Sequence, residues 1–326
     1  MRTRLTELLG IDVPVVLAPM GGAVGPELTA AVSNAGGLGI VPLSWSSPKE
    51  VGARVAEIKS LTDRPFGINL IREWDQRERL AAALDANVPV VSLFWGDATA
   101  LIDEARTGGA ITFVTVASAE EAARAAGSGA DVIVAQGWEA GGHVRGAVTT
   151  LALVPRVVDA VSVPVVAAGG IADGRGLAAA LALGAAGACV GTRFLAAQEA
   201  SIHEDYRQRL LAAVETDTYY GTLFDGGWPD APHRALRNST VETWEASGMP
   251  EPGSRPGEDD TPAFREDGTP IRRYASSTPS MGMTGDTEPM PNWAGQGVGL
   301  VHRVQPAGDI VREIVEEADQ TLTALA

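Results

Sequence analysis

The sequence predicts an α/β fold: a (β/α)₈ barrel with an irregular C-terminal cap segment and a final helix that packs on the barrel. Short apolar runs alternate regularly with helical patterns along the first 194 residues. The apolar runs are nearly continuous rather than alternating, which indicates parallel strands buried on both faces. A chain of 326 residues is also long enough for a barrel of about 250 residues in one domain.

Eight strand-like runs follow one another in order. They occupy residues 13–18, 38–43, 66–70, 88–94, 111–116, 132–136, 163–168 and 188–194. The helical patterns between them occupy residues 27–35, 48–60, the segment that starts at Ser118, 151–161 and 175–183. The alternative is a doubly wound sheet, which typically has a Gly-x-Gly-x-x-Gly turn after the first strand, and Gly21-Gly22 lacks that spacing.

The chain changes character after residue 194. A helix is expected over residues 204–214, and the segment from Trp228 to Trp293 then holds ten of the twenty prolines. That composition alone would suit a disordered linker. Because the segment also holds Trp244 and Tyr274, we expect an ordered, irregular cap instead.

The predicted organisation therefore has three parts. Residues 1–214 form the barrel, residues 215–300 form a proline-rich cap that closes the active site, and residues 301–326 return to the barrel as a helix. Within the cap, Met281 and Met283 are expected to influence substrate preference.

Composition limits the partners. A formal charge of −16 and a pI near 4.7 argue against nucleic acid and anionic membranes. The single cysteine, Cys189, excludes an intramolecular disulfide. The N-terminus lacks the apolar core of a signal peptide, and the longest apolar run, residues 176–191, is too short for a membrane span. We expect a cytoplasmic protein.

The stretch from residue 131 to residue 146 is the main candidate for chemistry. It begins as an apolar strand and breaks into a turn that carries His143 and four glycines, Gly137, Gly141, Gly142 and Gly146. Active sites of such barrels form at the carboxyl ends of the strands. A histidine with a pKa near neutrality can take an acidic proton or, when protonated, hold an anion. The alternative is an ordinary loop histidine.

Glycines also follow the seventh and eighth strands, as Gly169-Gly170 and Gly191-Thr192. Each turn precedes a possible helix start, so clustered backbone N–H groups and helix dipoles predict a phosphate site. Read singly, either turn could be an ordinary tight turn. No carboxylate and histidine spacing suggests a metal. The other histidines, predicted to be surface or packing residues, are His203, His233 and His302.

Six short motifs at these strand ends carry a resemblance. They are residues 18–20, 35–39, 65–70, 136–143, 167–174 and 191–194, and a seventh match follows at residues 293–296. In this order they resemble the nitronate monooxygenase family, formerly called 2-nitropropane dioxygenases.

The resemblance implies an FMN enzyme that uses O₂ to oxidise nitronates or nitroalkanes to a carbonyl compound and nitrite. It implies His143 as the catalytic base, the FMN phosphate on the turns after strands seven and eight, and the flavin ring against residues 18–20. The cofactor-binding residues implied are Ala18, Pro19, Met20, Gly21, Asn69, Gln136, Gly141, Gly142, Ala168, Gly169, Gly170, Gly191, Thr192 and Gln296. The partners are then a small molecule and O₂, and a homodimer is possible.

Two alternatives remain open. NAD(P)H-dependent FMN reductases of the enoyl-acyl-carrier-protein or quinone type share this barrel, but they favour an acidic residue at Gln136, and some a lysine at Thr115. A barrel that binds small molecules without catalysis is the other alternative, which the intact His143 turn argues against. We expect Glu139 in that turn to be a solvated charge.

Overall fold

The computed structural model describes residues 1–325 and contains one sheet of eight parallel strands, ordered β1-β9-β8-β6-β5-β4-β3-β2. The strands are β1 (Val15–Leu17), β2 (Gly39–Pro42), β3 (Phe66–Ile71), β4 (Val90–Phe94), β5 (Ile111–Val116), β6 (Val132–Gln136), β8 (Val165–Ala168) and β9 (Gly187–Val190). The two end strands meet through a parallel bridge between Val16 and Leu38, where Leu17 N donates to Leu38 O at 2.9 Å. The predicted barrel is therefore confirmed.

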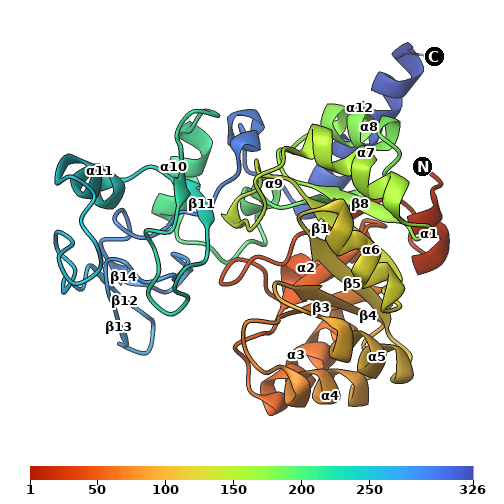
Figure 1. Ribbon diagram of the computed structural model, residues 1–326, viewed down its shortest axis with the longest axis horizontal. Coiled ribbons are helices and arrows are strands. Elements are labelled where there is room, and N and C mark those ends of the chain that lie inside the picture. The colour runs from red at the N-terminus through yellow and green to blue at the C-terminus, as the bar shows by residue number, and fades with distance from the viewer. Residues whose placement is uncertain (326) are drawn as a thin grey trace.

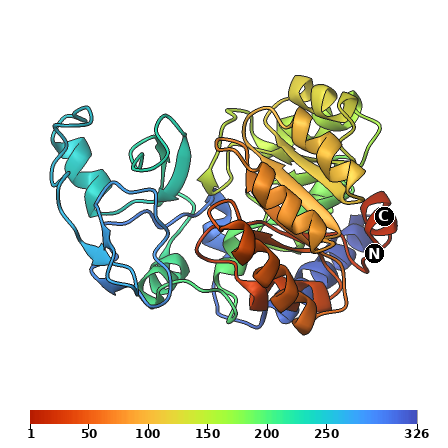
Figure 2. The ribbon, with the colours of Figure 1, turned by 90° about the horizontal axis from the view of Figure 1, so that it is seen from below.

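Helices cover the outside of this sheet (Figures 1 and 2). They are α2 (Pro26–Asn34), α3 (Pro48–Leu61), α4 (Arg77–Asp85), α5 (Thr99–Thr107), α6 (Ala119–Gly127), α7 (Thr150–Ala160) and α8 (Gly174–Ala182). The helix predicted from Ser118 begins as expected, because the Ser118 hydroxyl accepts from Glu121 N at 3.2 Å. The short helix α1 (Arg4–Leu9) contributes Leu5 and Leu9 to the core inside the barrel.

The eighth predicted strand is too long at its carboxyl end. Strand β9 stops at Val190, and Phe194 lies in the short helix α9 (Thr192–Leu195). The apolar run continues because Phe194 and Leu195 are buried in the packing of α9, so hydrophobicity did not mark the end of the strand. Gly191 marks it instead.

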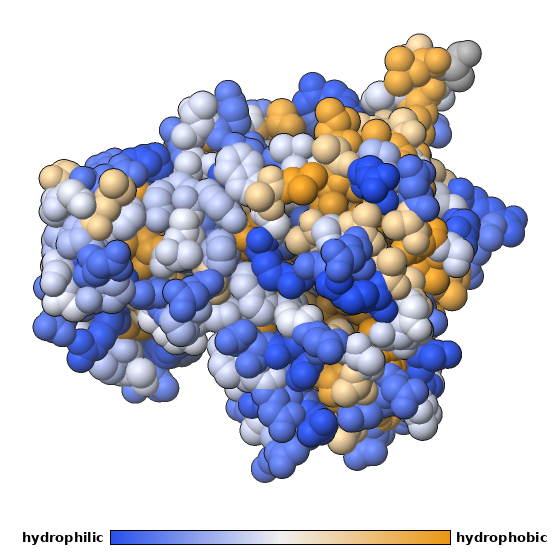
Figure 3. All heavy atoms as spheres, in the orientation of Figure 1, coloured by the Kyte–Doolittle hydropathy of each residue, from blue (hydrophilic) through white to orange (hydrophobic). Residues whose placement is uncertain are grey.

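The chain after α9 forms a second lobe beside the carboxyl ends of the barrel strands (Figures 1 and 2). Its elements are α10 (Glu204–Ala212), β10 (Thr218–Gly221), β11 (His233–Leu236), α11 (Ser239–Ala246), β12 (Ala263–Phe264), β13 (Pro270–Ile271), β14 (Thr284–Gly285) and the 3₁₀ helix η1 (Gln296–Leu300). We call residues 215–300 the cap. Two small apolar clusters lie within it, one around Phe224 and Tyr274, the other around Ile271 and Met290. On the side seen in Figure 3 the cap is mostly hydrophilic, whereas apolar residues gather on the upper part of the barrel.

One strand links the two lobes. Strand β7 (Gly142–His143) follows β6 in sequence, yet it pairs with β11 in a three-stranded sheet of order β10-β11-β7. His143 stands opposite His233 in this antiparallel pair. The turn that leaves the barrel after β6 therefore becomes part of the cap.

The last helix, α12 (Ala307–Leu325), packs on the outside of the barrel against α8 and α2, as the sequence predicts. Its buried face includes Ile310, Ile314 and Ala318. Close packing is possible because α8 begins with Gly174, where a Cβ would lie 2.4 Å from Ala318 N. Among residues 1–325, no helix is both long and apolar enough to span a bilayer.

The α12 contact can be tested with Ile314→Ala. Ile314 is 2% exposed, so truncation leaves a cavity and should lower the free energy of unfolding by about 2–5 kcal/mol. Leu151→Ala is the control, because Leu151 on α7 is 70% exposed and should change stability by less than about 0.5 kcal/mol. Chemical denaturation of both variants measures the difference, and equal midpoints would contradict this packing.

Candidate active site

The turn after β6 is held by backbone contact with the chain that returns from the cap. A Cβ on Gly141 would lie 2.5 Å from Gly295 N, and a Cβ on Gly295 would lie 2.7 Å from Glu139 O. Gln296 N donates to Glu139 O at 2.9 Å. Only glycine at positions 141 and 295 allows this approach, so the two segments fix each other's position.

A cavity of about 800 Å³ lies at the carboxyl ends of the strands, between the barrel and the cap. The predicted residues that line it are Ala18, Pro19, Met20, Gly21, Asn69, Gln136, Gly141, Gly142, His143, Ala168, Gly169, Gly170, Gly191 and Thr192. Gln296 does not line it, although its neighbours Gly295 and Gly297 do. The volume of the cavity is within the usual range for small-molecule and cofactor sites, about 300–1,000 Å³.

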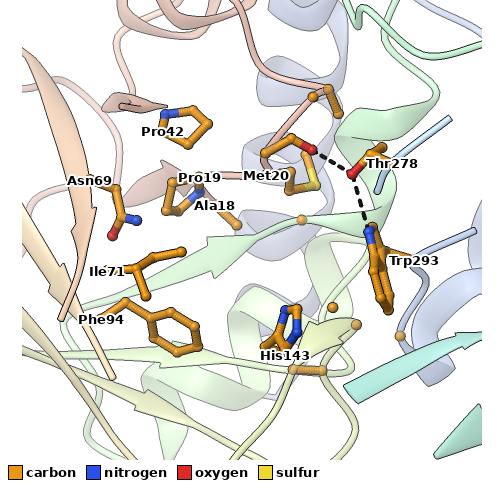
Figure 4. A pocket seen from close by; sticks show the side chains of 18 of the residues that line it. Ala18, Pro19, Met20, Pro42, Asn69, Ile71, Phe94, His143, Thr278 and Trp293 are labelled. Carbon is orange, nitrogen blue, oxygen red and sulfur yellow. Dashed lines mark hydrogen bonds between the residues drawn. The ribbon is translucent and has the colours of Figure 1, made fainter. Parts of the chain in front are cut away.

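Aromatic rings surround the imidazole of His143. Trp228 stacks on it with ring centroids 4.0 Å apart and planes at 25°, and Trp293 lies at 5.4 Å. Figure 4 shows the ring between Phe94 and Trp293. The Nε2 atom is buried and has no hydrogen-bond partner in the described chain. An unpartnered polar atom at a cavity wall is a binding point for a ligand.

The histidine beside it is held in one neutral form. His233 is fully buried, and its ring centroid lies 5.6 Å from that of His143. Its Nδ1–H donates to Ala231 O at 2.9 Å, and its Nε2 accepts from Phe224 N at 3.2 Å. Since a carbonyl accepts and an amide donates, the tautomer is determined.

These surroundings shift both imidazoles toward the neutral state. Burial, and secondly the neighbouring His233, lower the pKa of His143 to about 3. Burial lowers the pKa of His233 to about 4. The expected pKa near neutrality for His143 is therefore wrong, because the sequence does not reveal that the cap covers the ring. His143 is neutral at pH 7 and is a weak base.

His233 does not line the cavity, but it supports the site from behind His143, a role that the sequence did not predict. It was expected on the surface or in packing, and it packs directly behind His143 across the β7–β11 pair. No local signal could have found it, because the contact joins positions that are far apart in the chain.

Glu139 is also placed differently from the prediction of a solvated charge. Its carboxylate accepts from Thr150 N at 2.9 and 3.1 Å and from Thr150 Oγ1 at 3.1 Å. Thr150 Oγ1 lies 2.9 Å from Gly169 O. Glu139 thus caps the start of α7, where a carboxylate is favoured, and ties the His143 turn to the turn after β8.

Two amide side chains reach the cavity. Asn69 is 2% exposed, and its Oδ1 is buried without a partner among the described residues. Gln136 Nε2 donates to His143 O at 3.2 Å. Gln136 therefore holds the backbone of β7, and Asn69 offers an unpaired acceptor across the cavity from His143 (Figure 4).

The turns predicted for phosphate differ from the expectation in one respect. Gly169 and Gly170 have φ of +106° and +72°, and both line the cavity with Gly191 and Thr192. The start of α8, however, is already capped: Asp173 accepts from Gly176 N at 3.1 Å, and Glu317 accepts from Gly174 N at 2.7 Å. These two N–H groups at the start of α8 are therefore not free for a ligand, and the backbone turns before the helix remain the candidate phosphate site.

The cap side of the cavity uses other residues than the predicted methionines. Met281 is 69% exposed, Met283 is buried in a cap cluster, and neither lines the cavity. Thr278 does line it, and its Oγ1 donates to Gly21 O at 2.6 Å and accepts from Trp293 Nε1 at 3.1 Å (Figure 4). This hydrogen-bonded bridge joins the cap to the turn after β1.

The cavity offers little for metal or thiol chemistry. In the part of the chain that the structure describes, no group of three His, Cys, Asp or Glu side chains could hold a metal ion. Cys189 lines the cavity, but burial raises the pKa of its thiol to about 12. It therefore stays protonated and is a poor nucleophile.

Comparisons with known proteins agree with this geometry. The family model described as nitronate monooxygenase matches residues 2–77 and 71–317. A nitronate monooxygenase from Pseudomonas aeruginosa is 35% identical, over 97% of this chain and 99% of the relative. A (3aS,4S,5R,7aS)-5-hydroxy-7a-methyl-1-oxo-octahydro-1H-indene-4-carboxyl-CoA dehydrogenase from Rhodococcus jostii is 41% identical, over 76% of this chain and 69% of the relative.

Solved structures extend the similarity to the whole chain. FabK from Thermotoga maritima has a TM-score of 0.87 at 34% identity, and the match covers 100% of this chain and 98% of that one. A nitroalkane oxidase from Streptomyces ansochromogenes has a TM-score of 0.82 at 30% identity, covering 99% and 100% of the two chains.

The buried histidines should make stability depend on pH. Below a pH of about 6.5 His143 and His233 become protonated in the unfolded chain. In the folded protein both stay neutral until the pH approaches their lowered pKa values. The free energy of unfolding should therefore fall as pH drops from about 6.5 to about 4, by up to about 1.4 kcal/mol per pH unit for each histidine. Urea denaturation at several pH values measures the slope.

The matched variants are His143→Asn and His302→Asn, since His302 is exposed. The free energy of unfolding should depend less steeply on pH in His143→Asn than in the parent. In His302→Asn the pH dependence should stay as it is in the parent. A His143→Asn protein with the parent's pH slope would show that folded His143 is not held neutral.

Proposed function

This chain belongs to the nitronate monooxygenase family, and we propose from that premise that it binds FMN and oxidises nitronates or nitroalkanes with O₂ to a carbonyl compound and nitrite. The observation that carries the proposal is His143, whose buried Nε2 lacks a partner at the wall of the strand-end cavity. The membership makes the protein a flavin-dependent oxidoreductase.

The residues present fit FMN. Gly169, Gly170, Gly191 and Thr192 form a backbone cradle for the phosphate at one side of the cavity. The turn of residues 18–20 offers an apolar surface for the flavin ring, and the unpaired Asn69 Oδ1 offers an acceptor. When bound there, FMN would supply electron transfer from the substrate to O₂.

His143 then hydrogen-bonds the nitro group of the substrate, and its imidazole is the group that would take the proton from the α-carbon of a nitroalkane. A neutral imidazole with a pKa of about 3 removes a proton from a neutral nitroalkane slowly, because proton transfer follows the strength of the base. A nitronate is already deprotonated and needs only a hydrogen bond from Nε2–H. An anion at Nε2 also raises the pKa of the imidazole. We therefore propose nitronates as the preferred substrates.

We further propose that the chain works in the three parts predicted from its sequence: an FMN-binding barrel over residues 1–214, a cap over 215–300 that closes the site, and a segment over 301–326 that returns to the barrel. Its helix is α12 (Ala307–Leu325), and Ala326 lies outside the described residues. Trp228, Thr278 and Trp293 support the role of the cap, since all three line the cavity. A cytoplasmic location and a homodimer stay predictions from the sequence.

A second candidate function is oxidation or reduction of a thioester-linked substrate by the same flavin. The observation that favours it is the relative from Rhodococcus jostii, a carboxyl-CoA dehydrogenase, which is 41% identical, compared with 35% for the nitronate monooxygenase from Pseudomonas aeruginosa. An NAD(P)H-dependent reductase belongs to the same alternative. Anaerobic mixing with NADH separates the reductase from the nitronate monooxygenase, because a reductase bleaches its flavin rapidly and a nitronate monooxygenase does not need to.

Gly191→Ala tests the cofactor site. A Cβ there would lie 3.4 Å from Ala18 Cβ and 3.5 Å from Met20 Sδ, so the protein accommodates it, but the methyl group enters the cradle. We expect the variant to fold and to purify with much less FMN, measured by absorbance after heat release. Gly52→Ala, with open space around its Cβ, is the control. Full FMN content in both would contradict this placement.

His143→Asn tests the catalytic role. Turnover of neutral nitroalkanes, already slow in the parent because the imidazole is a weak base, should fall further when that base is removed. Preformed nitronates should retain far more activity, because only the hydrogen bond from the imidazole is lost. Oxygen consumption with each substrate form measures both rates, and His302→Asn is the control. Equal loss with both forms would show that His143 does not remove the proton.

A further inference from the structure

The charge of the cavity wall is opposite to that of the whole protein. The chain carries a formal charge of −16, yet within the described residues the cavity lining contains no Asp, Glu or Lys. Its one charged side chain is Arg265, which the cap contributes from the segment between β12 and β13. Arg265 is itself solvent-exposed, so an anion that approaches this acidic protein meets one accessible cationic side chain on the cavity lining.

Arg265 forms no salt bridge within the described residues, although it interacts with Asp267, whose pKa is lowered mainly by hydrogen bonds from Thr269 and to a smaller extent by the charge of Arg265. No carboxylate oxygen of residues 1–325 lies within 4.0 Å of its guanidinium, and its side chain donates to Ser277 Oγ at 3.3 Å. Nearby arginines of the cap differ: Arg272 pairs with Asp259 at 2.8 Å, and Arg273 pairs with an aspartate at 2.9 Å. A guanidinium without a carboxylate keeps its paired N–H donors available for a carboxylate or phosphate.

The loop beside Arg265 provides hydroxyl groups on the same wall. Ser276, Ser277 and Ser280 all line the cavity. Thr278, in the same loop, is held against Gly21 O, so the loop is fixed to the barrel at this point. Arg265 and its serine neighbours thus lie beside the turn after β1.

The cavity wall also carries a row of tryptophans. Trp45 contacts Trp74 with ring centroids 5.8 Å apart, Trp74 contacts Trp228 at 5.1 Å, and Trp228 stacks on His143. Trp45 is 58% exposed, so the row runs from the candidate base to solvent. Such faces bind flat apolar groups through large contact areas. A small nitronate would leave this surface uncovered.

We propose that the cavity binds an elongated substrate whose planar, apolar body lies along the tryptophan row and whose carboxylate or phosphate pairs with Arg265. This inference rests on the proposed function, which places the reacting end of the substrate at His143. It adds the chemical class of the substrate. Arg265 is then a specificity-determining residue. Because hydrogen bonds to charged groups contribute about 1.5–3 kcal/mol, the anionic group should strengthen binding by about 10- to 100-fold.

Ligand binding tests the site without turnover. The probes are 2-naphthoate, 2-naphthyl phosphate and the neutral 2-naphthamide, titrated into the purified holoprotein and followed by tryptophan fluorescence and flavin absorbance. We expect at least one anion to bind about 10- to 100-fold more tightly than the amide, and the better anion identifies carboxylate or phosphate as the group. In Arg265→Gln this ratio should fall toward one, and in the control Arg272→Gln it should persist.

Turnover tests the same ratio during catalysis. Two nitronates are compared that differ only in carrying a distal carboxylate or a distal carboxamide. In the parent protein kcat/KM should be higher for the carboxylate, and in Arg265→Gln the two values should become similar. Equal binding of anion and amide by the parent protein, or an unchanged ratio in Arg265→Gln, would overturn the proposal. Loss of FMN from Arg265→Gln would assign the arginine to the cofactor and would overturn it too.

The proposed reaction and the anion site at Arg265 can each be wrong without the other. If the parent binds the anionic probes through Arg265 but oxidises no nitronate, the proposed reaction is wrong and the anion site stands. If nitronates are oxidised without any preference for an anionic group, the reaction stands and the anion site is wrong.

Discussion

Close contact between two backbones organises the site. The turn that carries His143 lies directly on the chain returning from the cap, and no side chain larger than hydrogen fits at Gly141 or Gly295. One hydrogen bond, from Gln296 N to Glu139 O, joins the segments. Arg234 adds a second link, because it is buried, stacks on Trp138 at 4.2 Å and donates to the Trp138 carbonyl at 3.0 Å. The barrel and the cap therefore share one structural element.

The chemistry of His143 follows from that sharing. Once the turn becomes strand β7 of a cap sheet, the imidazole is enclosed by Trp228, Trp293 and His233. An enclosed imidazole with no carboxylate to stabilise its charge stays neutral. Such a residue is suited to hydrogen-bond an anion and poorly suited to strip a proton from a neutral carbon acid. Within residues 1–325 the cavity lining holds no carboxylate, which agrees with an anionic ligand.

Much of the site was predictable because strand ends in a parallel barrel converge. The turns after β1, β6, β8 and β9 are distant in sequence, but parallel topology brings their carboxyl ends to one rim, so identifying the strands located Met20, Gly169 and Gly191. Contacts made by the cap were not predictable in this way. The cap has short strands and irregular loops, and no periodic pattern indicates that Trp228 stacks on His143.

The sequence by itself determined the barrel, the order of its strands and the residues at its rim, since these depend on local apolar runs and glycine turns. It also determined the packing of α12, whose apolar face repeats with helical period. Only the tertiary structure decided the ionisation of His143, the capping role of Glu139 and the position of Arg265 on the cavity lining. Each of these depends on which distant charges and rings lie within a few ångströms. Burial and electrostatic interaction act through space. The distance between two groups that are far apart in the chain cannot be read from the local sequence around either of them.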